Sequence, residues 1–137
     1  VMNQKMLVLQ DAFFGNPEFG IASISITPEI DTPEILKEYA KNNGISHKNW
    51  HLLTGKSEDV VYGLSNNGFK LYAGKGDEGH GGFEHSGLFA LVDKNGFIRS
   101  RKDEFGNPLM YYRALEEQGF PDQIKELIED IKKLLNE

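Results

Sequence analysis

The sequence of 137 residues contains no cysteine. The chain therefore offers no disulfide, no thiolate nucleophile and no thiolate ligand for a metal ion. It also lacks any apolar stretch close to the roughly 18 residues that a membrane-spanning helix requires. The printed residues predict no secretory signal peptide. The lack of cysteine does not by itself identify a cellular compartment.

Positive charge is scarce as well. The chain has 15 lysines and arginines against 21 aspartates and glutamates, for a formal net charge of −6. The basic residues are scattered along the sequence and form no cluster. Because a nucleic-acid-binding surface needs concentrated positive charge to meet the phosphate backbone, we expect no nucleic-acid partner.

The residues that are present are enough for one folded domain. Hydrophobic residues make up 39% of the chain, and aromatic residues 11%. A chain of this length can bury one core and is short for two. We therefore predict a single domain over residues 1–137.

The spacing of apolar residues predicts alternating helices and strands. A period of three to four residues indicates a helix and a period of two a strand, and Ser, Thr, Asp, Pro and Gly mark the ends. In the first half of the chain the predicted elements are a helix over 2–13, a strand over 20–27, a helix from Asp31 or Thr32 to Gly44, a strand over 49–55 and a helix from Ser57. In the second half they are a strand over 69–73, a glycine-rich loop over 74–82, strands over 88–92 and 97–101, a helix over 107–119 and a last helix from Pro121.

Three local patterns in the second half of the chain are specific. Residues 88–92 are apolar at every position, as in a strand buried on both faces. Asn95-Gly96 predicts a type I′ hairpin turn. The last helix carries an apolar stripe typical of a helix that packs on a sheet: Ile124, Leu127, Ile128, Ile131, Leu134 and Leu135.

The order of these elements predicts an α/β fold of the thioredoxin-like type, with helices on both faces of a central sheet. That fold begins with a central strand that leads into its first helix. Here the first helix starts at residue 1 without a cap, and the strand is missing. Because an unpaired apolar strand edge favours aggregation, we expect either upstream residues or a strand of another chain to fill this position.

Two motifs suggest ligand sites but fail in detail. The loop GKGDEGHGG, residues 74–82, lacks the Gly-Lys-Ser/Thr ending of a phosphate-binding loop, and a strand rather than a helix follows it. Residues 93–104 have acids at the first and twelfth positions, like a calcium loop. Their glycine stands at position four instead of six, so a hairpin is the better interpretation.

Four histidines are the remaining candidates for metal chemistry, because imidazole binds copper and zinc well. His47 and His51 flank Trp50 and are interpreted as packing or surface groups, and His80 lies in the glycine-rich loop. His85 ends that loop just before the apolar strand. In a thioredoxin-like sheet this position lies beside the N-terminus of the first helix, so His85 is the candidate metal ligand. Its position alone is equally compatible with a loop histidine whose hydrogen bonds are satisfied within the protein.

Several stretches together resemble the Sco/SenC family. The segment SISITPEIDTPEILKEYAKNNG is similar to that family's strand, Asp-Pro-x-x-Asp-Thr turn and helix, although Thr27 and Ile30 replace the usual Asp and Arg. The segment HSGLFALVDKNGFIRSR resembles its histidine, strand and hairpin. NWHLLTG fits its Trp-x-Leu-Thr-Gly strand, and the first 13 residues resemble the helix after its Cys-x-x-x-Cys-Pro motif.

This resemblance implies a function. Sco/SenC proteins are thioredoxin-fold, membrane-anchored copper-binding proteins of the cell envelope that help to build the copper centre of cytochrome c oxidase. Some act as thiol–disulfide reductases on the copper-binding subunit of the oxidase. Their copper ligands are two thiolates and one histidine, and His85 matches the histidine. The two cysteines and the N-terminal membrane anchor have no counterpart in this chain.

Two other functions stay open. A thioredoxin-like module that binds a partner without metal or redox chemistry would also explain the missing cysteines. A peroxiredoxin-like thiol peroxidase is disfavoured, because a histidine before a hairpin is not that family's pattern. Whether a Cys-x-x-x-Cys-Pro motif precedes Val1 in the gene would distinguish the first two functions.

Overall fold

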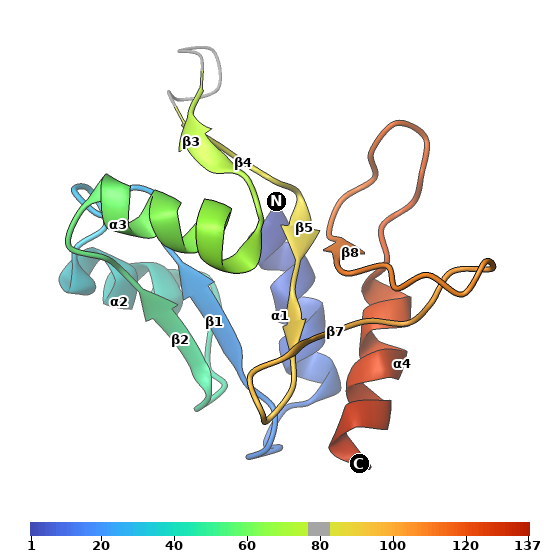
Figure 1. Ribbon diagram of the computed structural model, residues 1–137. Helices are drawn as coiled ribbons and strands as arrows, with labels where there is room; N and C mark the ends of the chain where they lie inside the picture. Colours follow the sequence, from blue (N-terminus) through green and yellow to red (C-terminus); the bar gives the residue numbers. More distant parts are fainter. Residues whose placement is uncertain (77–82) are drawn as a thin grey trace. The chain divides into compact units, whose positions relative to one another are not determined.

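The computed structural model describes residues 1–76 and 83–137, and for Phe83 and Glu84 the backbone alone. Most of the predicted glycine-rich loop, with His80, lies outside the described residues. The chain divides into two compact units (Figure 1): Val1–Phe13 with Gly87–Glu137, and Phe14–Ser86. In the described part of the chain, no helix has the length and hydropathy needed to cross a bilayer.

The unit Phe14–Ser86 is built on a βαβ motif, as predicted. Strand β1 (Ile21–Ile24), helix α2 (Pro33–Asn42) and strand β2 (Trp50–Leu53) follow in order, and the two strands pair in parallel. Thr32 caps α2 by accepting a hydrogen bond from the backbone of the first turn. Gly44, with φ of +72°, follows the helix in the left-handed conformation that glycine adopts easily.

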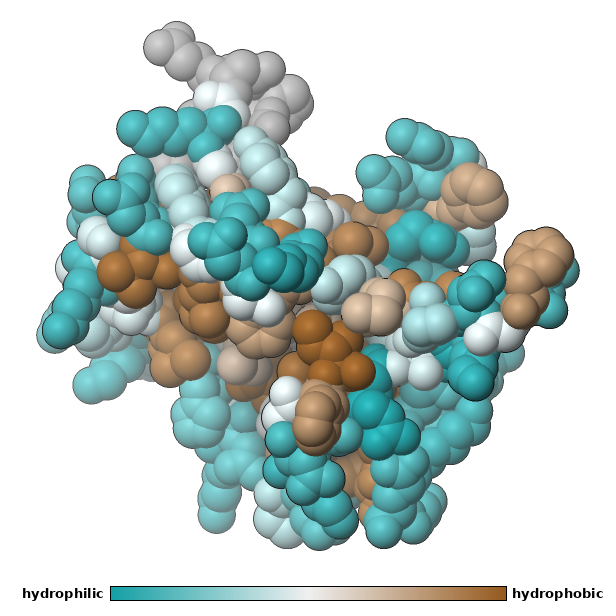
Figure 2. All heavy atoms as spheres, viewed as in Figure 1, coloured by the Kyte–Doolittle hydropathy of each residue, from teal (hydrophilic) through white to brown (hydrophobic). Residues whose placement is uncertain are grey.

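The β1–β2 pair is held by its backbone and by one side-chain bridge. The indole Nε1 of Trp50 donates to Ser23 Oγ at 3.0 Å across the two strands. Among the described residues, no third strand joins this pair. Figure 2 shows hydrophobic surface over β2 and the helix that follows it, where Leu53, Val60 and Leu64 are exposed.

A short helix follows β2 and widens into a π-helix. Helix α3 (Glu58–Gly63) begins at Ser57, whose side chain accepts from the Val60 N–H, as the sequence predicts. It continues as the π-helix η1 (Leu64–Phe69), which ends at Lys70 with a positive φ of 56°. π-Helical turns are rare and occur frequently at functional sites.

The predicted strand over 69–73 is misplaced. The π-helix extends to Phe69, and strand β3 runs from Ala73 to Lys75, into the predicted glycine-rich loop. It pairs in antiparallel register with β4 (Phe83–His85) to form a two-stranded ribbon, visible in Figure 1. The apolar residues of 69–73 suggested a strand, but the left-handed Lys70 interrupts it.

The other unit is held by two helices that pack together, α1 (Met2–Ala12) and α4 (Ile124–Leu135). The ammonium group of Lys5 on α1 lies 2.8 Å from the carboxylate of Asp122 just before α4. The apolar stripe predicted for α4 is confirmed, because Ile124, Leu127 and Ile131 are buried. In the first helix Leu9 is buried, and so is Phe13 just after its end.

The predicted central strand over 88–92 is two short strands with different partners. β5 (Leu88–Phe89) pairs with β8 (Tyr112–Arg113), and β6 (Leu91–Val92) pairs with β7 (Ile98–Arg99). Phe89 is buried, whereas Val92 is 43% exposed. An unbroken apolar run predicts burial on both faces, but it does not show that the chain exchanges one partner strand for another at Ala90.

The hairpin after β6 forms, but its turn is not type I′. Asn95 has no positive φ; only Gly96 does, at +84°. The Gly96 N–H donates to the Asp93 carbonyl, and Asp93 Oδ1 accepts from the backbone N–H groups of Asn95 and Phe97. The loop is therefore a three-residue hairpin with a left-handed glycine. Asp103 and Gly106 repeat this turn one hairpin later.

The helix predicted over 107–119 is wrong. Met110 has a φ of +70°, which excludes a right-handed helix, and its N–H donates to Ser100 Oγ at 2.9 Å. The segment instead lies against the residues that follow β7, through an isolated antiparallel bridge between Lys102 and Pro108. The type I′ turn of this chain is at Gln118-Gly119, where both residues have a positive φ.

Candidate functional site

The candidate ligand His85 is the last residue of β4. Its antiparallel partner in the ribbon is Ala73, which is only 3% exposed, whereas His85 itself is exposed. The next residue, Ser86, donates its backbone N–H to the Tyr72 carbonyl at 2.8 Å, which extends the ribbon by one hydrogen bond. The imidazole therefore lies on hydrogen-bonded backbone at the base of the ribbon.

The hydrogen bond of the His85 ring determines which nitrogen is available. Nδ1 lies 2.9 Å from the carbonyl oxygen of Ser86. Because a carbonyl oxygen can only accept, Nδ1 must carry the proton, and the neutral ring keeps its lone pair on Nε2. Metal-binding histidines usually have this arrangement, in which the second nitrogen donates to a carbonyl or carboxylate. His85 is thus in the tautomer that binds a metal through Nε2.

The other described histidines have different surroundings. His47 is buried, with its ring edge-on to Phe14 and Phe19 at 6.2 and 5.7 Å between centroids. Its Nδ1 accepts from the Asn49 N–H at 3.1 Å. This is the packing role expected for it. His51 is exposed on β2, and His80 lies outside the described residues.

The donor atoms of the described residues do not complete a metal site. Within residues 1–76 and 83–137, no three His, Cys, Asp or Glu side chains are grouped so that they could hold a metal ion. The sequence has no cysteine to add. His85 therefore does not belong to a complete group of three such side chains in the described part of the chain.

The segment that resembles the Asp-Pro-x-x-Asp-Thr motif forms a hydroxyl–carboxylate cluster after β1. Ser25 Oγ and Thr27 Oγ1 both donate to Asp31 Oδ2, the latter at 3.1 Å. Thr27 stands where many members of the Sco/SenC family have Asp. Because a hydroxyl can donate to a carboxylate, this replacement satisfies Asp31 where a second carboxylate would repel it.

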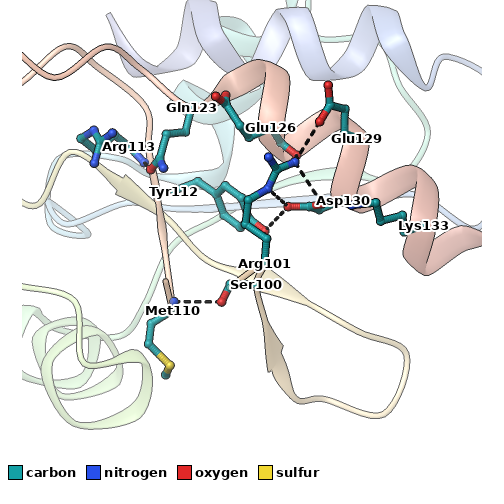
Figure 3. Close-up of polar contacts among 10 residues, drawn as sticks. All are labelled: Ser100, Arg101, Met110, Tyr112, Arg113, Gln123, Glu126, Glu129, Asp130 and Lys133. Atoms are coloured by element: carbon teal, nitrogen blue, oxygen red, sulfur yellow. Dashed lines mark hydrogen bonds and ion pairs between the residues drawn. The ribbon is translucent and has the colours of Figure 1, made fainter. Parts of the chain in front are cut away.

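A buried charge cluster in the other unit was missed from the sequence. Figure 3 shows the Arg101 guanidinium beside the carboxylates of Glu129 and Asp130 on α4. Arg101 binds both oxygens of Asp130, through Nε at 2.7 Å and Nη2 at 3.1 Å. Asp130 also accepts from the hydroxyl of Tyr112 at 2.8 Å and from Lys133 at 3.0 Å. The indication in the sequence was the position of Asp130, which directly precedes Ile131 of the predicted apolar stripe.

The electrostatics of this cluster indicate a structural role. Burial raises the pKa of Asp130, but hydrogen bonds from Arg101, Tyr112 and Lys133 outweigh it and bring this pKa below its ordinary value. Burial, with the hydrogen bond to Asp130, raises the pKa of Tyr112 to about 12. The phenol is thus protonated at neutral pH and fully buried, so it acts as a fixed donor and not as a base.

Comparison with known proteins places the chain among related sequences. Residues 1–118 match the family SCO1/SenC. Over 117 residues the chain is 31% identical to the SCO1 protein homolog of Bacillus subtilis (strain 168), in a match that covers 85% of this chain and 53% of that protein. It is 40% identical over 76 residues to a SCO2-like protein of Rickettsia typhi (strain ATCC VR-144 / Wilmington), covering 53% of this chain and 36% of that protein. The chain thus spans about half the length of the first relative and about a third of the second.

Two solved structures are similar over nearly the whole chain. One is a SCO1/SenC family lipoprotein from Bacillus anthracis str. Ames, with a TM-score of 0.76 and 25% identity, covering 98% of this chain and 71% of that one. The other is BsSco, described as having a disulfide switch and as a member of the Sco family of cytochrome c oxidase assembly proteins. It has a TM-score of 0.74 and 29% identity, and the match covers 97% of this chain and 69% of that one.

Proposed function

Since the chain belongs to the SCO1/SenC family and shares the thioredoxin-like α/β fold of its solved relatives, we propose that it is a copper-binding assembly factor for cytochrome c oxidase. In this proposal His85 supplies one ligand to copper. The two thiolates that the family resemblance implies are absent from this sequence.

The observation that carries the proposal is the state of the His85 ring. The imidazole is exposed, its Nδ1–H donates to the Ser86 carbonyl, and its Nε2 keeps the lone pair. Imidazole nitrogen suits copper, and it favours Cu(II) more than thiolates do. The hydrogen bond to Ser86 also limits rotation of the ring, so that less motion is lost when Nε2 binds a metal ion.

The partner and location follow from the same relatives. BsSco is described as a cytochrome c oxidase assembly protein, and the Bacillus anthracis relative is a lipoprotein. We therefore propose that the partner is the copper-binding subunit of the oxidase, and that the protein works in the cell envelope, on the outer side of the inner membrane. If cysteines precede Val1 in the gene, reduction of that subunit's cysteines is a further role.

A second candidate function is a thioredoxin-like module that binds a partner without metal. It is favoured by the lack of cysteine and by the lack of three grouped ligands in the described part of the chain. The two candidates differ in one respect, because only the first requires His85 to bind copper.

The His85→Ala substitution tests the proposal. In the protein as its gene encodes it, this change should weaken Cu(II) binding by at least about tenfold, since even the loss of a supporting group around a metal often has that effect. If the full gene product carries the two thiolates, Cu(I) binding should weaken less, because two thiolates suffice for the softer ion. The measurement is a competition titration of each oxidation state against a chelator.

The matched control is His51→Ala, which removes the exposed histidine of β2. It should leave the affinity for both copper ions unchanged. If the His85 variant and the wild type bind Cu(II) with equal affinity, His85 is not a copper ligand. That result would favour the module that binds a partner without metal.

A further inference from the structure

The strand opposite His85 is held on its outer edge by a side chain instead of a third strand. The amide of Asn66, in the π-helix η1, donates from Nδ2 to the Ala73 carbonyl at 2.8 Å, and its Oδ1 accepts from the Ala73 N–H at 3.3 Å. The same Nδ2 donates to the Tyr62 carbonyl at 2.9 Å, which ties the amide to the preceding helical turn. One side-chain amide thus pairs with both polar groups of the Ala73 backbone.

A second contact of the same turn supports this arrangement. Ser65 Oγ donates to the Leu71 carbonyl at 2.6 Å, and the Leu71 N–H donates to the Ser65 carbonyl at 2.9 Å. Between these two anchored residues, the Tyr72 carbonyl accepts from the Ser86 N–H. The backbone polar groups of this segment therefore alternate in direction. Those of residues 71 and 73 bond to the π-helix, and the carbonyl of residue 72 bonds to the strand that contains His85.

This alternation defines how Ala73 meets His85. In an antiparallel ladder, a residue whose N–H and C=O point away from the partner strand belongs to a non-hydrogen-bonded pair, in which the two Cα atoms approach most closely. The backbone groups of Ala73 point to Asn66, so the Ala73–His85 pair is of this kind. The backbone of His85 thus depends on where Asn66 places Ala73.

We infer that Asn66 is a positioning residue for His85, which holds β3 in the place that presents the imidazole Nε2 to copper. The inference rests on the proposed copper-binding role of His85. A neighbouring strand would supply the same two hydrogen bonds, but none pairs with this edge of β3 in the described part of the chain. The π-helix is what brings Asn66 to that edge.

The test is a comparison of two neighbouring asparagines. Asn66→Ala should weaken Cu(II) binding about fivefold, the effect expected from the net loss of one or two hydrogen bonds around a ligand. Asn66→Asp keeps the acceptor for the Ala73 N–H but loses the donor, and should give an intermediate loss. The control Asn67→Ala changes the same residue type one position along, where the side chain is exposed, and should bind copper like the wild type.

A double-mutant cycle separates positioning from general destabilisation. If Asn66 acts through His85, then Asn66→Ala should have no further effect on Cu(II) affinity in a His85→Ala background. An equal loss in both backgrounds would overturn the inference. The inference would also be overturned if the Asn66 variants bound Cu(II) as tightly as the wild type while His85→Ala bound it less tightly. That result would leave the proposed function intact.

A measurement on the metal-free protein tests the positioning role of Asn66 independently of the proposed copper binding. Nitrogen-15 NMR of the His85 ring should show the Nδ1–H tautomer in the wild type and in Asn67→Ala, and a mixture of tautomers in Asn66→Ala. Hydrogen exchange at the Ala73 amide should be faster in Asn66→Ala than in the wild type and in Asn67→Ala. Unchanged ring and amide signals in Asn66→Ala would overturn the positioning role whatever copper does. If Asn66→Ala fails to fold, the ring signals of Asn66→Asp decide, because that variant loses the donor to the Ala73 carbonyl.

Discussion

At the scale of single residues, the most consequential side chain outside the copper-ligand candidate is Asp130. Its side chain is 8% exposed and is bound by Arg101, Tyr112 and Lys133. These partners stabilise the buried carboxylate. Removing its charge leaves the Arg101 guanidinium without its main counter-charge. The cluster connects α4 to strand β8 and to the segment after β7, which are far apart in the sequence.

Asp130→Asn should therefore destabilise the fold by about 2–3 kcal/mol, close to the value of hydrogen bonds to charged groups. Breaking a fully buried ion pair costs about 3–5 kcal/mol. The loss in stability should be smaller here, because the Arg101 side chain is 28% exposed and still forms its ion pair with Glu129. Denaturant unfolding of the variant and the wild type measures the difference.

The control for this substitution is Glu129→Gln, at the exposed partner of the same arginine. The Glu129 side chain is 49% exposed, so its ion pair should contribute less than about 1 kcal/mol. If both variants lose the same stability, burial of Asp130 is not what gives the cluster its strength.

At the scale of elements, helix α4 illustrates how a local pattern predicts packing. The stripe of apolar residues predicted a buried face, and Ile124, Leu127 and Ile131 are buried at 3–6% exposure. In the structure its last turn carries Lys132 and Lys133, whose positive charges favour a helix C-terminus. The sequence did not show that Asp130 belongs to the buried face.

Leu127→Ala should reduce the free energy of unfolding by about 2–5 kcal/mol, because the side chain is 3% exposed and its removal leaves a cavity. The matched control is Leu134→Ala on the same helix, where the side chain is only partly buried and the loss should be at most half as large. A shift of the denaturant midpoint worth under about 0.5 kcal/mol for Leu127→Ala would show that α4 is peripheral.

The turn types were predicted poorly. Asn95-Gly96 indicated a type I′ turn, yet the Asp93 carboxylate accepts two backbone N–H groups and favours a longer turn with the glycine alone left-handed. Gln118-Gly119 carried no such signal and forms the type I′ turn. Turn type depends on the register of the flanking strands, which a dipeptide does not contain.

At the scale of the whole molecule, the carboxylates make stability depend on pH. The Lys5 hydrogen bond lowers the pKa of Asp122, and the Phe97 N–H, followed by Arg99, lowers that of Asp93. The pKa values of Glu129, Asp130 and Glu137 are lowered as well, each through an arginine partner. All five groups belong to the unit that contains α1 and α4.

A carboxyl group whose pKa is lower in the folded state stabilises the protein above its unfolded pKa, near 4, and loses this contribution as pH falls through the folded pKa. The free energy of unfolding should thus be nearly constant from about pH 7 to 5 and should decrease below about pH 4. Urea unfolding at a series of pH values measures this. Stability that rises on acidification would contradict the lowered pKa values.

The sequence by itself determined the features that depend on near neighbours. The caps at Thr32 and Ser57, the stripe of α4 and the βαβ order follow from spacing and capping within a few residues. The resemblance that indicated the family, and His85 as a candidate ligand, also depends on short stretches of sequence. These signals are readable because the interacting groups are close in the chain.

Only the tertiary structure decided the features that depend on how the folded backbone places two groups. The change of partner strand at Ala90, the Arg101–Asp130 pair at a separation of 29 residues, and the Asn66 amide on the Ala73 backbone leave no local pattern. The tautomer of His85 belongs here too, because it depends on where the backbone places the Ser86 carbonyl. The physical reason is that a hydrogen bond or an ion pair requires two groups at a set distance and direction, and only the folded chain sets both.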